Sequence, residues 1–299
     1  MDKKKCDEYW EQFHSALDEI GIVVGDILYV SSDSMKILAT ASKELGIRGK
    51  EERDVFLHQM VNALCRHVGE GGTILFPVYS WAFCKGQPFD YRKTPGEVGA
   101  LNNFVLLHRP DFVRTRHPMY SFMVWGRYAE ELYQMNNQDA WGEGSPFAFL
   151  HRMGAKELGL SLPLVRTLTF KHYVEQAVRV PYRYPKYFLS HYIDENGVDE
   201  VRSYSMLVRD LSVKLSSCQE LDFFLERGSA KRTYACGWEM FSLEYAAAFD
   251  QIKEDFLHNH GRNFYHFEDD QIHWETERNC YEIGFLKNAD CLSVEKNDD

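Results

Sequence analysis

The stretch DVFLHQMVNALCRHVGEGGTILFP, residues 54–77, contains the two patterns that decide the fold. Its first part predicts an amphipathic helix over 54–68, because apolar residues recur every three or four positions. The run Gly69-Glu-Gly-Gly72 ends this helix, and the apolar run Thr73-Ile-Leu-Phe-Pro77 that follows predicts a buried strand. The apolar stripe of the helix consists of Phe56, Leu57, Met60, Val61, Leu64 and Val68.

The same order of helix and strand precedes this stretch. Between Glu8 and Gly21 the apolar residues again follow a helical spacing, and Gly21 supplies a stop. The run DILYVSS, residues 26–32, predicts a second buried strand that leads into a polar turn. Helix, strand, helix and strand at this spacing predict an α/β fold whose sheet is covered on its faces.

The rest of the chain predicts fewer regular elements. Residues 81–141 are rich in Pro, Gly, Arg and aromatic residues, which is typical of a segment that carries a site. The patterns predict a helix over 167–180, a structured loop over 181–188, a strand over 198–208 and a helix over 243–257. Because no repeat or linker is visible, we expect one domain over 1–287 and a polar tail over 288–299. Within that domain, residues 9–194 carry the motifs and 195–287 form a C-terminal strand and helix part.

Composition excludes several classes of protein. The 45 acidic and 34 basic residues give a formal charge of −11, which disfavours a nucleic-acid partner. Seven scattered cysteines without C-x-x-C spacing favour reduced thiols over a zinc site or a disulfide framework. The absence of an 18-residue apolar run and of a secretion signal predicts a cytoplasmic protein without a membrane partner. Phosphate-loop, dinucleotide, metalloprotease and esterase motifs are absent too.

Four segments, in this order, carry a resemblance to a known family. They are Gly25-Asp-Ile-Leu-Tyr-Val-Ser-Ser32, Gly72-Thr-Ile-Leu-Phe-Pro-Val-Tyr-Ser-Trp81, Arg114-Thr-Arg-His-Pro-Met-Tyr-Ser-Phe122 and Thr169-Phe-Lys-His-Tyr-Val-Glu-Gln-Ala-Val178. The segment Gly142-Glu-Gly-Ser-Pro146 lies between the third and the fourth. Together they resemble the aminoglycoside 3-N-acetyltransferase (antibiotic acetyltransferase) family.

The resemblance implies a fold and a reaction. It implies an acetyltransferase domain with a mixed sheet flanked by helices. It also implies that acetyl-CoA is the cosubstrate, without a metal, and that the acceptor is a small-molecule amine or amino sugar. The chain would then act as a monomer or a homodimer.

His172 and Glu175 are the candidate catalytic residues. Acetylation of an amine needs a base that removes a proton from the nitrogen, and imidazole titrates near neutral pH. Three residues apart on a helix, the two side chains share one face, so the carboxylate can orient the ring. From spacing alone, a solvated helix pair is the more frequent arrangement, and it is the resemblance that implies a catalytic pair.

Arg166 is a departure from the family pattern, which commonly has an Asp six residues before this His. An arginine suits a carboxylate or phosphate better than a polycation. Arg166 is therefore a candidate substrate-binding residue. Tyr182, in the aromatic run over 182–188, is a second candidate, because aromatic rings can stack on a sugar. A surface arginine and a core tyrosine are the structural alternatives.

Six further residues are candidates for contact with acetyl-CoA. Each has a structural alternative: a helix cap, a turn, a solvated arginine or a histidine bonded beneath a loop. Of these residues, His117 is also the second candidate for the base, and Ser121 for a donor to the thioester oxygen. The six are Ser31, Ser32, Ser80, Arg114, His117 and Ser121.

Three functions remain open on the sequence. The first is acetylation of an aminoglycoside by acetyl-CoA. The second is acylation of a nucleotide-linked amino sugar in surface polysaccharide synthesis, towards which Arg166 points. The third is a relative that binds CoA or a sugar without catalysis.

Overall fold

A computed structural model describes residues 3–218, 220–268, 272 and 274. Its helices are α1 (Lys3–Glu19), α2 (Ser34–Leu45), α3 (Gly49–Val68), α4 (Ala100–His108), α5 (Ala129–Gln134), α6 (Pro146–Arg152), α7 (Phe170–Val178), α8 (Leu221–Glu226) and α9 (Tyr245–His258), with short 3-10 turns η1 (Phe83–Lys85) and η2 (Leu164–Arg166). Its strands are β1 (Ile27–Ser32), β2 (Thr73–Pro77), β3 (Phe89–Asp90), β4 (Val113–Arg114), β5 (Phe122–Gly126), β6 (Lys156–Leu160), β7 (Arg183–Ile193), β8 (Asp199–Arg209), β9 (Leu215–Ser217), β10 (Ala230–Ala235), β11 (Trp238–Glu244) and β12 (Tyr265–Phe267).

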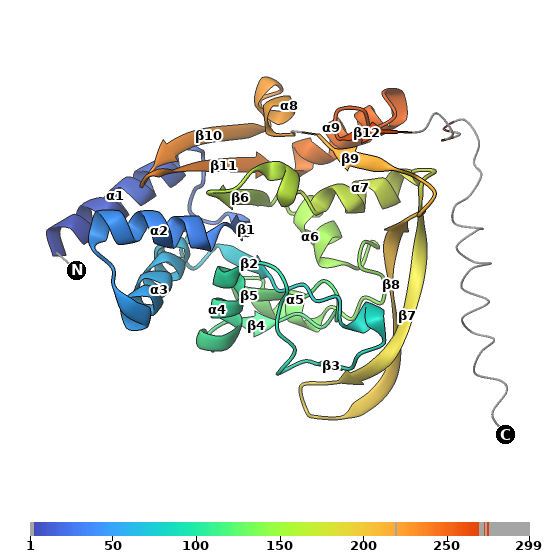
Figure 1. Ribbon diagram of the computed structural model, residues 1–299, viewed down its shortest axis with the longest axis horizontal. Helices are drawn as coiled ribbons and strands as arrows, with labels where there is room; N and C mark the ends of the chain where they lie inside the picture. The colour runs from blue at the N-terminus through green and yellow to red at the C-terminus, as the bar shows by residue number, and fades with distance from the viewer. Residues whose placement is uncertain (1–2, 219, 269–271, 273, 275–299) are drawn as a thin grey trace.

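The main sheet is mixed and has seven strands in the order β10-β11-β6-β1-β2-β5-β4. At its centre β1 pairs in parallel with both β2 and β6. The flanking strands β11 and β5 run antiparallel to this centre. A separate sheet consists of β3, β7 and β8, and the long β7–β8 hairpin lies on the right-hand side of the described part of the chain in Figure 1. This arrangement confirms the predicted mixed sheet flanked by helices.

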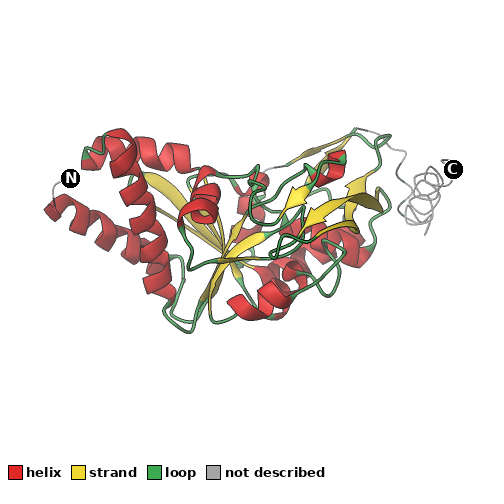
Figure 2. Cartoon of the chain, turned by 90° about the horizontal axis from the view of Figure 1, so that it is seen from below, coloured by secondary structure: helices red, strands yellow, loops and turns green. Residues whose placement is uncertain are grey.

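Both faces of the central strands are covered. Every residue of β1 and β2 is buried, as expected for parallel strands with helices on each side. Alternate residues of β1 enter different cores: Leu28 and Val30 join one cluster, and Ile27 and Tyr29 join the other. Figure 2 shows helices on both sides of the strands. The second cluster lies under α6, α7 and α9, and so it supports the helix that carries the catalytic candidates.

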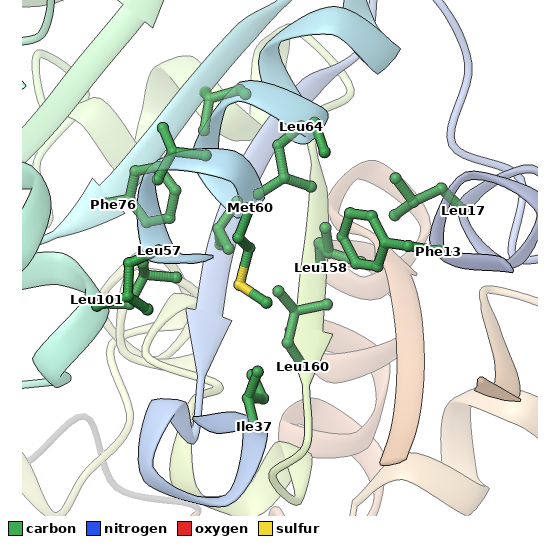
Figure 3. Packing of buried hydrophobic residues seen from close by; sticks show 14 of the residues in the cluster. Phe13, Leu17, Ile37, Leu57, Met60, Leu64, Phe76, Leu101, Leu158 and Leu160 are labelled. Carbon is green, nitrogen blue, oxygen red and sulfur yellow. The ribbon is translucent and has the colours of Figure 1, made fainter. Parts of the chain in front are cut away.

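The first cluster lies between α1–α4 and the sheet. Figure 3 shows Phe13 of α1, Met60 of α3 and Leu158 of β6 among its members. All three side chains are fully buried. The predicted stripe of the helix over 54–68 is therefore its packing face.

Gly159 allows a close contact in the middle of the main sheet. It pairs with Phe241 of β11, whose ring covers the position where a side chain would start. A Cβ atom at residue 159 would lie 2.0 Å from the Phe241 ring. Phe241 can pack against β6 only because residue 159 has no side chain.

The predicted elements agree with the structure, with one correction and some omissions. The strands over 26–32 and 73–77 and the helix over 54–68 appear as β1, β2 and α3, and the later strand and helix appear as β8 and α9. The segment 181–188 was predicted as a loop, and this is wrong, since its residues from Arg183 onward begin β7. Its aromatic and Pro residues obscure the alternation of apolar and polar residues that predicts a strand. The hairpin β10–β11 was not predicted.

The predictions on membrane spans and on cysteines can be compared with the structure only over the described residues. None of the helices in the described ranges is long and apolar enough to cross a membrane. The cysteines in these ranges, namely Cys6, Cys65, Cys84, Cys218 and Cys236, are free thiols. The predicted polar tail over 288–299, Cys280 and Cys291 lie outside the described residues.

Candidate functional site

Helix α7 carries the catalytic candidates, and its apolar face fixes it on the second core. Phe170 and Val174 are fully buried in that core. The Phe170 ring stacks on Tyr245 of α9, with ring centroids 4.1 Å apart and planes at 5°. At the other end Arg179 has a φ of 54°, a left-handed conformation that ends the helix. The helix is therefore held at both ends, which gives the residues on its other face a defined position.

His172 and Glu175 meet on that face. The distance between His172 Nδ1 and Glu175 Oε2 is 2.5 Å. The His172 side chain is 28% exposed, whereas the Glu175 side chain is completely buried. The predicted shared face is confirmed: the carboxylate lies beneath the ring, and the ring reaches solvent.

Glu175 has two further partners from the start of β7. Tyr182 donates its hydroxyl proton to Glu175 Oε1 at 2.7 Å, and Arg183 Nε lies 2.8 Å from Oε2. Burial raises the pKa of the Glu175 carboxyl, but the charge of Arg183 and the hydrogen bond from His172 outweigh burial and hold the pKa well below its ordinary value. Glu175 is thus a buried carboxylate anion.

The state of the His172 ring follows from this anion. An ionised carboxylate only accepts hydrogen bonds, so Nδ1 carries the proton and donates a hydrogen bond to Glu175. Burial, and next the charge of Arg183, lower the pKa of His172 below 6.5 despite the neighbouring carboxylate. The ring is therefore neutral at pH 7, and the lone pair of Nε2 can accept a proton.

The wall beside His172 is aromatic. Trp141 contacts the imidazole edge to face, with ring centroids 5.5 Å apart. Tyr120 packs against Trp141 at 4.4 Å, and Trp81 packs against Tyr120 at 5.5 Å. Trp81 is partly exposed, so the row runs from the surface to the imidazole.

The two candidate substrate-binding residues occupy different environments. Arg166 ends the turn η2 and is exposed, and it forms no ion pair with any residue in the described ranges. Tyr182 is fully buried, and its hydroxyl is bonded to Glu175. This position favours support of Glu175 over stacking on a sugar. Contact of Arg166 with a substrate stays a prediction.

Arg114 and Ser121, two of the acetyl-CoA candidates, contact each other inside the protein. Arg114 Nε donates to Ser121 Oγ at 3.1 Å, and the Ser121 hydroxyl donates to Val78 O at 3.1 Å. The Arg114 guanidinium also donates to the carbonyls of Tyr91 and Thr94. Burial lowers the pKa of Arg114 to about 10. Both residues are buried and hold backbone segments, so a contact with acetyl-CoA would require these bonds to break.

Ser80 is buried as well, in the turn that follows β2. Its hydroxyl donates to Glu97 Oε1 at 3.2 Å, and Trp81 N donates to the same oxygen at 2.6 Å. The pair holds the turn on which Trp81 stands.

His117 is a histidine bonded beneath a loop. Its Nδ1 accepts the N–H groups of Met119 and Tyr120, at 3.3 and 3.1 Å. Burial lowers its pKa to about 3. Because Nδ1 is occupied and the ring is only 1% exposed, the geometry favours His172 over His117 as the base.

Ser31 belongs to a buried polar network that sequence reasoning missed. Its hydroxyl donates to Oε1 of Glu157, and Tyr245 donates to Oε2, each at 3.1 Å. Glu157 is fully buried in the middle of β6. Ser32 is also buried, and its hydroxyl has no partner among the described residues. The cap of α2 is Asp33, which accepts from Lys36 N at 3.1 Å, and not either serine.

Glu157→Gln should make the chain more stable at pH 8 than at pH 5, relative to wild type. Burial raises the pKa of Glu157 from 4.5 to about 7. Between these values the folded chain holds a proton that the unfolded chain has lost, so the wild-type free energy of unfolding falls as pH rises. We expect the stability difference between variant and wild type to change by about 2.5 kcal/mol in favour of the variant.

Urea unfolding at both pH values measures this difference, and groups common to both proteins cancel. An equal effect of Glu157→Gln at pH 5 and pH 8 would show that Glu157 does not titrate between them.

Sequence reasoning also missed Arg183 and Tyr265 as neighbours of Glu175. Arg183 lies eight positions beyond Glu175 in the segment predicted as a loop, and Tyr265 lies ninety positions beyond it. No local signal connects them with α7.

His172 does not line the hollow beside the β7–β8 hairpin. That hollow has a volume of about 520 Å³ and lies between Arg116, Gln138 and Tyr204. We therefore identify the candidate site from its side-chain chemistry.

Comparisons with known proteins identify the family of the chain. A family model described as aminoglycoside 3-N-acetyltransferase matches residues 46–279. Aminoglycoside N(3)-acetyltransferase III of a Salmonella species is 29% identical over 189 residues, which are 56% of this chain and 59% of that protein. The protein of the same name from Enterobacter cloacae matches equally. The chain thus matches less than two thirds of the length of these relatives.

Solved structures share the fold. The acetyltransferase AAC(3)-Xa aligns with a TM-score of 0.67 at 19% identity, over 85% of this chain and 94% of its own. AAC-IIIb in a binary complex with CoASH aligns with a TM-score of 0.65 at 20% identity, over 82% of this chain and 94% of its own. The YokD protein from Bacillus subtilis aligns with a TM-score of 0.66 at 20% identity, over 85% of this chain and 95% of its own. At these identities the likeness concerns the fold.

Proposed function

The chain belongs to the aminoglycoside 3-N-acetyltransferase family, and on that premise we propose that it transfers an acetyl group from acetyl-CoA to an amino group of an aminoglycoside or a related amino sugar. The observation that carries the proposal is the contact of 2.5 Å between His172 Nδ1 and Glu175 Oε2. It combines a partly exposed neutral imidazole with a buried anion, an arrangement suited to general-base catalysis by histidine. AAC-IIIb, a structural relative, has been solved with CoASH bound, which supports the choice of acetyl donor.

In the proposed reaction, the nitrogen of the neutral amine attacks the carbonyl carbon of the thioester. A C–N bond forms, and the carbonyl oxygen takes negative charge. His172 Nε2 accepts a proton from the attacking nitrogen, and Glu175 stabilises the imidazolium that results. When the C–S bond breaks, the proton passes to the CoA thiolate. The products are the amide and free CoA, and the ring returns to its neutral state.

The acceptor is the open part of the proposal. AAC-VIa, a structural relative, has been solved with sisomicin bound, which supports an aminoglycoside. Arg166, exposed and six residues before His172, favours instead an acceptor that carries a negative charge, such as a nucleotide-linked amino sugar. We place the reaction in the cytoplasm, a location supported by the free thiols of the described cysteines.

Release of free CoA thiol from acetyl-CoA tests the proposal directly. We expect thiol release with an amino-sugar acceptor and none with the matching N-acetylated sugar. We also expect a rise in melting temperature with acetyl-CoA that a chelator does not change. The panel contains gentamicin-type aminoglycosides and nucleotide-linked amino sugars, so it separates the two acceptor classes.

Each outcome has a distinct meaning. Turnover of nucleotide-linked sugars with little change in the gentamicin tolerance of a susceptible host would support the acceptor that Arg166 favours. Acetyl-CoA binding without turnover of any amine would support the non-catalytic alternative. If calorimetry detects no binding at millimolar acetyl-CoA, the proposal is wrong.

A further inference from the structure

Arg183, the first residue of β7, lies behind the catalytic candidates. Its side chain is almost fully buried, and its Nε lies 2.8 Å from Oε2 of Glu175, the oxygen that also accepts from His172 Nδ1. The other side of the guanidinium contacts Tyr265, since Nη2 donates to the Tyr265 hydroxyl at 3.4 Å. Arg183 thus joins α7 to β12.

Lys171, the neighbouring cation, does not pair with Glu175. Lys171 precedes His172, and its ammonium group forms a buried ion pair with Glu220. The same ammonium lies 4.2 Å from the centre of the Tyr265 ring. With Lys171 bound to Glu220, Arg183 is the cation that directly pairs with Glu175 among the described residues.

We infer that Arg183 is a positioning residue for acetyl transfer: by pairing with Glu175 from behind, it keeps the carboxylate turned towards His172 Nδ1 and keeps the imidazole neutral before each turnover. The inference rests on the proposed function for its chemical consequence. Its electrostatic part concerns His172 and Glu175 alone.

The geometry explains both effects. A buried carboxylate needs a charged partner, and Arg183 places its Nε 2.8 Å from Oε2 while its Nη2 is held by the Tyr265 hydroxyl. A positive charge in contact with Glu175 also lies close to His172, where it opposes protonation of the ring. The second effect has the expected sign, because Arg183 lowers the pKa of both His172 and Glu175.

The groups that face His172 are few. Glu175 and Lys171 come from its own helix, Arg183 from β7 and Tyr182 from the residue before β7. Tyr265 of β12 faces Glu175, and Glu220 faces Lys171. Of these, Arg183 is the cation that directly contacts Glu175, since Lys171 pairs with Glu220.

Titration of the His172 ring by NMR, with labelled histidine, tests the inference without requiring activity. The resonance is assigned by its loss in His172→Asn. In Arg183→Gln we expect the pKa of His172 to rise by about 1 unit, and in Arg183→Lys to stay closer to wild type. Arg232→Gln, which removes an exposed arginine from β10, is the control for overall charge.

Activity gives the second measurement. In Arg183→Gln the acid limb of the pH profile of kcat should move to higher pH by as much as the pKa of His172 measured by NMR rises. Most of the kcat lost at pH 7 should therefore be recovered at pH 8.5. KM for acetyl-CoA should stay unchanged. A purely structural role would lower kcat at every pH. An unchanged His172 pKa in a folded Arg183→Gln chain would overturn the inference.

A second background keeps the test decisive if Arg183→Gln does not fold. There, Glu175→Gln is compared with Glu175→Gln/Arg183→Gln, and the pKa of His172 should again be higher without Arg183. Equal values would overturn the inference. If wild type transfers no acetyl group although the pKa rises as expected, the proposed function fails and the coupling of Arg183 to His172 stands.

Discussion

His172→Ala should lower the turnover of acetyl transfer by about 10²–10⁴-fold, which is the usual contribution of a positioned proton acceptor. Affinity for acetyl-CoA should stay nearly the same, because the variant removes the base and leaves the thioester's surroundings intact. Steady-state kinetics measures the first effect, and calorimetry the second. The rising limb of the wild-type pH–rate profile should vanish in the variant.

The comparison between variants matters more than the profile alone, since deprotonation of the amine also produces a rising limb. His117→Ala is the matched histidine variant. Because His117 accepts two backbone N–H groups beneath a loop, its loss should lower stability more than turnover per folded molecule. If His172→Ala keeps near-normal turnover while a folded His117→Ala chain loses it, the base is His117 and the assignment to His172 is wrong.

Glu175→Gln should lower the free energy of unfolding by about 3–5 kcal/mol, the range for breaking a buried ion pair on one side. The variant leaves the buried guanidinium of Arg183 without its carboxylate. Turnover should fall less than in His172→Ala, because the glutamine oxygen can still accept from Nδ1. Urea unfolding and kinetics on the folded fraction measure the two effects.

The double variant Glu175→Gln/Arg183→Gln is the control for this stability effect. Removal of both charges leaves no unpaired cation, so we expect it to regain part of the lost stability. If the double variant loses as much stability as the two single variants together, the two charges do not interact in the folded chain.

Local sequence was sufficient for the central elements of the fold. The stripe over 54–68 and the apolar runs over 26–32 and 73–77 became α3, β1 and β2, since a helix or strand buried on one or both faces needs those periods. The spacing of His172 and Glu175 likewise sufficed to predict a shared helix face. These properties depend on residues a few positions apart.

Tertiary structure alone decided what surrounds that pair. Arg183 and Tyr265 reach their partners only when β7 and β12 pack against α7. Glu157 reaches Ser31 and Tyr245 only when β6 lies beside β1 and α9. Nothing in the local pattern distinguishes Arg183 from a solvated arginine. Burial likewise separated His172 from His117, two histidines that the sequence offered for one task. The reason is physical: the charge state of a side chain depends on desolvation and on neighbours within a few ångströms, and the fold brings those neighbours from distant parts of the chain.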